Sequence, residues 1–538
     1  MLSGIDCKNS RLIISDSHEP NHRFVAYIFP ENDAGVSSGN AGGRVYMSRK
    51  RTPEWSLWSF RPLIIYLGDV FLPSGYPQSV SEDYLPSIAG LLSSRAVLQG
   101  VGVGNADASP TSALLLHILQ DTSGRIATIL FAHRASTALE PECKTYRLAA
   151  DVFNDLAMIL DCLSPMVPAG FMRVSVLSTA GVLRALCGVA GGSSKASLSA
   201  HFARWGNLAE LNAKDSSQET VISLIGMLVG SVVVSHVTGF TSTWIALLCL
   251  LGLHLGMNYA AVRSVQMTSL NRQRANIVFS ALFESDSKLN QSISKTRSLR
   301  DVSTGLDPAI KSSPSRHISE SSNSPIFLTP AQAASQEYIF PRQGTLTWTS
   351  PFGAKQETCL GSADIGLSLE FFLKQAQRHA SSLTTPTTNQ SPSSFHTTVP
   401  MIQLAELYAD EKYLLYLFPR TNRSPPSTQT WHASILLKKD CTVPDQLKAW
   451  AHALFAARVL NMDCEKSRLP GGDRAEKSTV SVSASSTSDL VMGCMADTLS
   501  VLNEGGRFGE YLGVMRANGW DVDIGALETR GGRRVECA

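Results

Sequence analysis

The sequence has little charge for its length and no pairing pattern among its cysteines. Charged residues make up only 17% of the 538 residues, against about 25% in an average soluble domain. Basic and acidic residues nearly balance, at 47 and 45, so nothing favours nucleic acid as a partner. The ten cysteines form no CxxC pair and no Cys/His set with zinc-site spacing. We therefore expect reduced cysteines, no metal and no cofactor.

The sequence also lacks an evident targeting peptide and a phosphate-binding loop. Asp6, Asp16 and Glu19 interrupt the N-terminal segment, which has neither the apolar core of a secretory signal nor the composition of an Arg-rich transit peptide. The glycine-rich segments 100–104 and 188–192 lack the Gly-Lys-Ser/Thr ending of a phosphate loop. We therefore propose no catalytic residue from the sequence.

The strongest physical signal is a pair of uncharged apolar runs. Val221–Thr238 and Thr243–Tyr259 carry no formal charge, and Gly239–Ser242 separates them. As helices they would be about 27 and 25 Å long, close to the ~30 Å hydrocarbon core of a bilayer. This pattern predicts a membrane hairpin. Because His236 and His254 interrupt the runs, a buried hairpin in a soluble core is the alternative.

Both runs carry glycines four residues apart, Gly226 with Gly230 and Gly252 with Gly256. Small residues at this spacing allow close helix packing in lipid, so we predict helix-packing positions here. Basic residues flank the hairpin on both sides while its turn is uncharged, which places both ends on the cytosolic or matrix side. The segment from Asn271 to Arg274, on this basic side, is a candidate contact for anionic lipid headgroups.

Other apolar stretches are shorter or more mixed. The segment Phe171–Ala190, for example, carries Arg173 and Arg184. Ionisable groups at membrane depth normally face protein or a water-filled cavity. Such stretches are therefore either further spanning helices around a polar interior or helices packed at the membrane surface. We expect a multi-pass membrane protein with the lipid bilayer as a partner.

A polar cluster directly precedes the first apolar run. Its candidate residues for a ligand site or gate at the membrane boundary are Arg204, Asn207, Lys214, Asp215, Gln218 and Glu219. The alternative is a solvated, salt-bridged loop and helix cap, which would contribute little. A lysine can form a Schiff base with an aldehyde, but no neighbouring residue marks Lys214 as activated.

Composition divides the chain into four parts. We predict a mainly α protein, in which a helical membrane-embedded domain is followed by a disordered linker and a small α/β C-terminal domain. The boundaries are 1–60 for a poorly defined N-terminal segment, 61–284 for the membrane domain, 285–335 for the Ser-rich linker, and 336–538 for the C-terminal domain, with disordered inserts near 381–400 and 466–488.

Local patterns predict several elements. Short β-like runs occur at Arg11–Ile14 and Phe24–Phe29, and longer strand patterns at Tyr413–Phe418 and Trp431–Leu437. A helix begins at the cap Thr442, with Asp445 three residues later, and runs to about Leu460. Two more helices are predicted, over Leu490–Glu504 and Phe508–Ala517.

Several segments resemble the root UVB-sensitive (RUS) family. They are, in order, FLPSGYPQSVSEDYL (71–85), GVGVGNA (100–106), RLAADVFNDLAM (147–158), GVAGGSSKASLSAHFARWGNLAELNAKDSSQETVISLIGMLVGS (188–231) and NYAAVRSVQMTSLNRQRANIVFSALFES (258–285). DEKYLLYLF (410–418) is similar more weakly. After Asp83-Tyr84-Leu85 the chain reaches the glycine-rich segment sooner than the family pattern does. Either the first membrane-associated helix is truncated or the sequence has lost a piece.

The resemblance implies a membrane-associated protein, and the family has no established catalytic residues to carry over. Plant members are linked to UV-B sensitivity, early seedling development, vitamin B6 homeostasis and auxin transport. We expect a non-enzymatic membrane protein in small-molecule homeostasis, acting by transport or in a complex with a family member or another protein. Two alternatives stay open: a membrane-anchored interaction scaffold, and a membrane enzyme acting on a B6 vitamer or a lipid.

Overall fold

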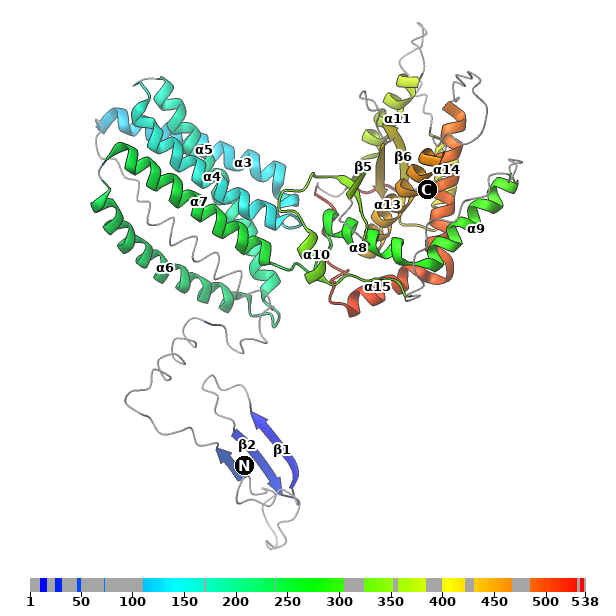
Figure 1. Ribbon diagram of the computed structural model, residues 1–538, viewed down its shortest axis with the longest axis horizontal. Coiled ribbons are helices and arrows are strands. Elements are labelled where there is room, and N and C mark those ends of the chain that lie inside the picture. The colour runs from blue at the N-terminus through cyan, green and yellow to red at the C-terminus, as the bar shows by residue number, and fades with distance from the viewer. Residues whose placement is uncertain are drawn as a thin grey trace. The chain divides into compact units, whose positions relative to one another are not determined.

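The structure is a computed structural model in which two compact units are defined (Figure 1). One comprises residues 1–102 and 198–257, and the other residues 103–197 and 258–538. The residues that it describes are 10–16, 25–30, 46–49, 72, 110–168, 171–237, 239–303, 324–351, 357–383, 399–420, 430–466, 484–529 and 533–536.

The first unit contains a small antiparallel sheet and the central apolar helices. Strands β1 (Ser10–Asp16), β2 (Val25–Pro30) and β3 (Tyr46–Arg49) pair in the order β1-β2-β3. The two β-like runs expected near the N-terminus are therefore confirmed. Helix α6 covers Leu208–His236, and α7 covers Phe240–Ser264 and continues into the second unit.

Helices α6 and α7 contain the predicted hairpin. The helix α6 begins well before the apolar run, so the polar cluster is mostly helical rather than a loop. Their apolar side chains are widely exposed: Leu228 on α6 is 63% exposed and Ile245 on α7 is 59% exposed. Three described helices are long and apolar enough to cross a membrane, namely α6, α7 and α5 (Phe171–Phe202).

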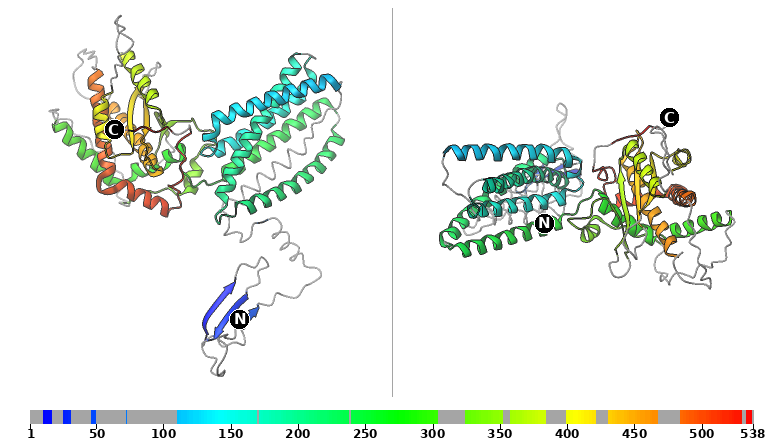
Figure 2. Two further views of the ribbon diagram at one scale, coloured as in Figure 1. Left: turned by 180° about the vertical axis from the view of Figure 1, so that it is seen from behind. Right: turned by 90° about the horizontal axis from the view of Figure 1, so that it is seen from above.

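The second unit begins with three helices that lie side by side, α3 (Pro110–Leu139), α4 (Cys143–Leu163) and most of α5 (Figure 2). A short 3₁₀ turn, η2 (Ser164–Met166), ends α4. Small residues bring α3 and α5 together, since a Cβ at Gly124 would lie only 3.4 Å from that of Ala185. An ion pair between Asp161 and Arg184 joins α4 to α5. The segment 171–190, which mixes apolar residues with two arginines, lies within α5, a helix long enough to cross a membrane.

The C-terminal part of the second unit is built on a four-stranded mixed sheet. The strands β4 (Thr345–Thr349), β5 (Glu357–Ile365), β6 (Tyr413–Arg420) and β7 (Thr430–Leu437) pair in the order β4-β5-β7-β6. The β5–β7 pair is parallel and the other two are antiparallel. The predictions of β6 and β7 are confirmed, whereas β4 and β5 were not predicted.

Helices surround this sheet. Their bounds are α8 Arg272–Ser285, α9 Ser287–Ser303, α10 Pro330–Gln336, α11 Leu369–Leu383, α12 Met401–Leu407, α13 Val443–Lys466, α14 Ala484–Asn503, η3 Glu504–Gly506 and α15 Arg507–Ala517. The predicted start of α13 after Thr442 is confirmed, and the Thr442 amide donates to the Asp445 carboxylate over 2.9 Å, as in half of a capping box. The helices predicted near α14 and α15 are also present.

Helix α8 lies inside the C-terminal core. Phe279 and Phe283 are fully buried and stack with ring centroids 5.8 Å apart, and Phe283 reaches Phe455 of α13 at 5.1 Å. The helix packs on β4 and on α13. The last segment of the predicted membrane domain 61–284 is thus part of the core that the sheet forms.

Two parts of the predicted disordered linker 285–335 are helical instead. Asp286 caps α9 by accepting from the Lys288 and Leu289 amides, and Leu289 is completely buried. Thr329 and Gln332 cap α10 reciprocally, with the Thr329 amide donating to Gln332 over 2.9 Å. These two helices form although they contain few apolar residues, because their N-caps and their contacts with the neighbouring core stabilise them. Residues 304–323, and most of both predicted inserts (384–398 and 467–483), lie outside the described residues.

Candidate functional site

The predicted polar cluster lies at the start of α6. Asn207 is the N-cap residue, but its side chain caps no backbone amide. Lys214, Asp215, Gln218 and Glu219 follow within α6, and among them only Asp215 is buried. Arg204 is exposed just before the helix. The arrangement is a partly buried polar turn of helix, and its role as a ligand site or gate stays a prediction.

The glycine pairs on α6 and α7 have different surroundings. Gly226 and Gly230 are buried. Gly252 and Gly256 are exposed, and no described atom lies within 4 Å of where a Cβ would stand on either. Only the α6 pair therefore sits where an added side chain would have to be accommodated. The helix-packing role of all four stays a prediction.

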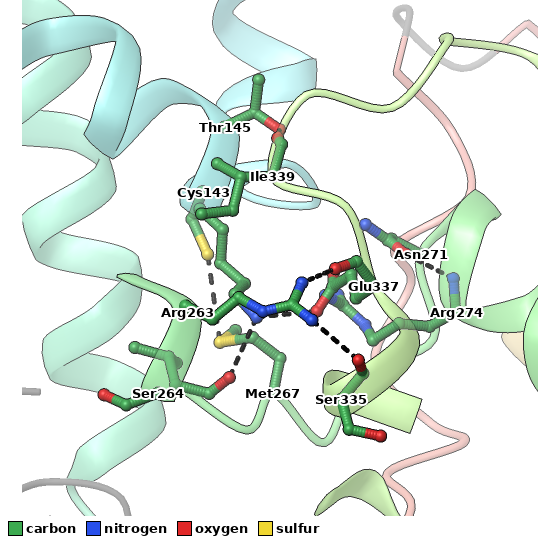
Figure 3. A network of polar contacts seen from close by, with 12 residues as sticks. Cys143, Thr145, Arg263, Ser264, Met267, Asn271, Arg274, Ser335, Glu337 and Ile339 are labelled. Atoms are coloured by element: carbon green, nitrogen blue, oxygen red, sulfur yellow. Dashed lines mark hydrogen bonds and ion pairs between the residues drawn. The ribbon is translucent and has the colours of Figure 1, made fainter. Parts of the chain in front are cut away.

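A buried ionic network lies in the second unit, and sequence reasoning did not predict it (Figure 3). The Glu337 carboxylate accepts from Lys144 Nζ and from Arg274 Nη1, each over 2.7 Å. Lys144 comes from the first turn of α4, Arg274 from α8, and Glu337 from the residue after α10. Their side chains are at most 6% exposed. One carboxylate thus joins three segments of the chain.

Further contacts fix the cations of this network. Lys144 Nζ also donates to the Val265 carbonyl over 2.9 Å, and Arg274 Nε donates to the Ser269 carbonyl over 2.6 Å. Arg263, near the end of α7, donates to the Ser335 carbonyl over 2.7 Å and to the Glu337 carbonyl. The end of α7 is thereby attached to the segment around α10. Figure 3 shows Arg263 directed at Ser335 and Glu337.

Asn271 connects this network to a second buried carboxyl. Its Oδ1 accepts from the Arg274 amide over 2.9 Å and so caps α8. Its Nδ2 donates to Glu142 Oε2 over 3.1 Å. The prediction that the segment Asn271–Arg274 contacts lipid headgroups is therefore wrong for Asn271 and for Arg274. Both are at most 2% exposed, because they face Glu142 and Glu337.

The two carboxyls have opposite pKa shifts. Burial raises the pKa of Glu142, since desolvation disfavours its charged form more than the nearby Arg274 favours it. Burial would also raise the pKa of Glu337, but the adjacent Arg274 and Lys144 charges outweigh it and hold that pKa below its usual value. Glu337 is the anion of the network, and Glu142 takes up a proton more readily than an exposed glutamate does.

Glu142 also faces a cavity of about 330 Å³, which we call the Glu142 cavity. Its wall includes basic, acidic, amide and aromatic side chains. Those that matter for its chemistry are Glu142, Arg272, Asn276, Tyr338, Arg342 and Gln343. The volume falls at the lower end of the usual range for small-molecule sites, about 300–1,000 Å³.

The wall of the Glu142 cavity is held by buried neighbours. Arg272 Nε donates to the Leu527 carbonyl over 2.8 Å, and its guanidinium lies 5.7 Å from the Trp450 ring centroid. Trp450 Nε1 donates to Asn276 Oδ1 over 2.9 Å. Gly344 has φ +69°, and a Cβ there would stand 3.2 Å from the Ala363 carbonyl and 3.6 Å from Arg272. Glycine suits this turn because of its positive φ and the close approach of the Ala363 carbonyl.

Metal and nucleophile chemistry receive no support from the described residues. Within the described ranges no group of three His, Cys, Asp or Glu side chains could hold a metal ion. The sequence does contain HEPNH at residues 18–22 and GVSSG at 35–39, two short patterns of hydrolase type. Both lie outside the described residues. Pro20 interrupts the helix that the first pattern would need.

Comparison with known proteins supports the family resemblance. Residues 59–286 match the family model described as "Vitamin B6 photo-protection and homoeostasis domain". The chain is 40% identical over 229 residues to RUS family member 1 of Dictyostelium discoideum, covering 40% of this chain and 43% of that protein. It is 34% identical over 233 residues to Protein root UVB sensitive 3 of Arabidopsis thaliana, covering 41% and 52%. Residues 59–286 of this chain are therefore similar to the root UVB-sensitive family.

The matched part is limited in extent. The aligned region spans about half the length of these two curated relatives. No solved structure matches the chain significantly. The matched segment 59–286 contains Glu142, Lys144, Asn271, Arg272 and Arg274, whereas Glu337 and Arg342 come from outside it. The Glu142 cavity is thus shared between the family segment and the C-terminal domain.

Proposed function

We propose that this chain is a non-enzymatic, multi-pass membrane protein in vitamin B6 homeostasis, acting on a small molecule by transport or within a membrane complex. The description of the matched domain supports the vitamin B6 part. The observation that carries the membrane part is the exposed apolar surface of α6 and α7, where large side chains such as Leu228 and Ile245 are more than half exposed.

Exposure of this kind is costly in water. Burying apolar surface contributes roughly 25 cal/mol per Å², and soluble monomers rarely expose large contiguous apolar patches. Lipid tails remove this cost without a protein partner. We propose the lipid bilayer as the environment of α5, α6 and α7, with the two ends of the α6–α7 hairpin on the cytosolic or matrix side.

A scaffold function is the second candidate, favoured by a surface groove in the C-terminal domain. The groove lies beside α12, where Ile402 is 76% exposed, and is lined also by Lys412, Lys438 and Lys439. A protein partner recruited there would leave the helices as an anchor. A family member or another protein of the same membrane would suit either version.

Two measurements test the proposal together. Cells that lack the protein should show altered levels of B6 vitamers, and the wild-type chain should restore them. Proteoliposomes that contain the purified full-length protein should take up pyridoxine faster than empty vesicles if the protein transports alone. Restored vitamer levels without uptake would favour the complex. Normal vitamer levels in the deletion cells would refute the vitamin B6 assignment.

A further inference from the structure

We infer that the Glu142 cavity is a binding site for a small organic phosphate monoester. Its wall brings Arg272 and Arg342 to one space together with amide side chains. Arginine is suited to this task, because its planar guanidinium matches phosphate oxygens through two parallel hydrogen bonds. The inference rests on the proposed function for the identity of the ester, which we take to be a phosphorylated B6 vitamer.

The charges around the cavity favour an anion. Its wall and the adjoining network contain five basic side chains and three carboxyls. The basic ones are Lys144, Arg263, Arg272, Arg274 and Arg342, and the carboxyls are Glu142, Glu337 and Glu357. Glu337 is already engaged by Lys144 and Arg274. Within the wall itself Arg272 and Arg342 accompany Glu142 and Glu357, and the raised pKa of Glu142 weakens the negative side of this balance.

The organic part of the ligand has its own complementary groups. Tyr338 and Phe340 line the cavity and are 49% and 57% exposed, so their rings offer aromatic surface to a planar heterocycle. The Glu142 carboxyl also lines the cavity, and this residue is 6% exposed. An acidic side chain is the usual partner of the ring nitrogen when proteins hold a pyridine cofactor. A pyridine ring that carries a phosphate ester matches all three features.

The composition of the wall also indicates how the ligand would be held. No lysine is among the described residues that line the cavity. The nearby Lys144 ammonium is occupied by Glu337 and by the Val265 carbonyl. A Schiff base with an aldehyde vitamer has no amine available at this site. The site is therefore one of non-covalent binding, as fits a protein that carries, transports or senses its ligand.

The test is a titration of the full-length protein, purified in detergent, with pyridoxine 5′-phosphate as the probe. This vitamer has no aldehyde, so it does not react with surface lysines. We expect saturable binding, and about tenfold or greater weakening when pyridoxine replaces its phosphate ester, since hydrogen bonds to charged groups are among the strong ones. Glycerol 3-phosphate should compete weakly, because it has no ring for Tyr338 and Phe340.

A variant in the cavity wall and a control variant elsewhere test whether the ligand binds in the Glu142 cavity. Arg342→Gln removes an exposed cation of the wall and should weaken binding about tenfold or more while the protein stays folded. Arg516→Gln is the matched control, because Arg516 is also exposed but lies on α15 and pairs with Asp523. Glu142→Gln should weaken the phosphate ester and free pyridoxine by the same factor, since it acts on the ring.

Three results would overturn the inference. They are absence of binding to the wild-type protein, equal binding by wild type and Arg342→Gln, and equal affinity for pyridoxine and its phosphate. Displacement of the probe by nanodiscs containing phosphatidic acid, but not by plain nanodiscs, would reassign the site to a lipid headgroup. None of these results touches the proposed function, which altered vitamer levels in deletion cells test separately.

Discussion

The Lys144 ammonium lies 2.7 Å from the Glu337 carboxylate, although 193 residues separate them in the chain. Lys144 begins α4 and Glu337 follows α10, which packs with α8 on the C-terminal domain. The pair therefore ties a helix of the family-matched segment to a segment beyond it. Because both side chains are buried, loss of either partner would leave an unpaired charge where the two segments meet.

Removing the carboxylate should destabilise the protein strongly. Glu337→Ala leaves Lys144 and Arg274 buried without their anion, and breaking a buried pair in this way costs about 3–5 kcal/mol. The measurement is thermal unfolding of the purified protein. Glu370→Gln is the control, since Glu370 pairs with Lys374 on an exposed face of α11 and should leave unfolding nearly unchanged. Similar melting of the two variants would show that the network carries no stability.

Acid should destabilise the C-terminal domain through His452. Burial, the main cause, lowers the pKa of this histidine to about 3, the charge of Lys448 lowers it further, and the hydrogen bond to the Met495 carbonyl acts in the opposite direction. The unfolded chain binds a proton below about pH 6.5, whereas the folded chain does not until about pH 3. Stability should therefore fall on acidification through this window, by about 1.4 kcal/mol per pH unit for one proton.

The histidine is identified by comparing two pH profiles. His452→Gln removes the titrating group, although it also disturbs contacts with Tyr413 and Thr498. The variant should be less stable than wild type at pH 7, but its stability should depend less on pH between 6.5 and 4.5. Denaturant unfolding at several pH values measures both. Parallel profiles would assign the acid sensitivity to other groups.

Membrane insertion is tested by extraction. The exposed apolar faces of α6 and α7 predict that alkaline carbonate leaves the protein in the membrane fraction and that detergent is needed to release it. A peripheral protein of the same membrane, followed in parallel, should be released. Recovery of this chain in the carbonate-soluble fraction would refute insertion.

Two glycines, one in each helix of the hairpin, make a matched pair. Gly230 on α6 is buried, whereas a Cβ at Gly256 on α7 would meet no described atom within 4 Å. Gly230→Leu should therefore reduce accumulation of the protein, and Gly256→Leu should be tolerated. Protein level in membranes, measured by immunoblot, decides the matter. Equal loss with both would point to a partner helix that covers Gly256 in the membrane.

The polar turn of α6 is tested by complementation. Lys214→Met and Glu219→Gln remove charge from two half-buried positions in α6. If they line a ligand site or gate, both should abolish rescue of a deletion strain while membrane insertion and protein level stay normal. Full rescue by both variants would leave the cluster with only a solvating role, as exposed charges usually have.

The sequence was most informative where the hydrophobicity of a segment alone determines its structure. Length and lack of charge identified the helices α6 and α7, and short runs of apolar residues identified β6 and β7. The strand β5 was missed because Gly361 and several small polar residues weaken its pattern. The segment before Pro330 was expected to be disordered, since capping and a neighbouring core are not visible in its polar composition.

The buried network was beyond sequence reasoning for a different reason. Lys144, Arg274 and Glu337 each look like ordinary surface charges in a polar stretch. Nothing in the local pattern brings together residues so distant in the chain. The one available signal was the basic segment ending at Arg274, which suggested a membrane contact because charge alone does not indicate which partner it meets.

The family match ends before the core that buries helix α8 is complete. The matched segment ends at residue 286, yet the rings of Phe279 and Phe283 are buried among Phe455, Phe508 and Tyr511, which belong to helices far beyond it. A protein that contained only the matched segment would expose the face of α8 that these rings cover. The unit that can be moved between relatives is therefore larger than the matched segment, and a graft should include α13 and α15.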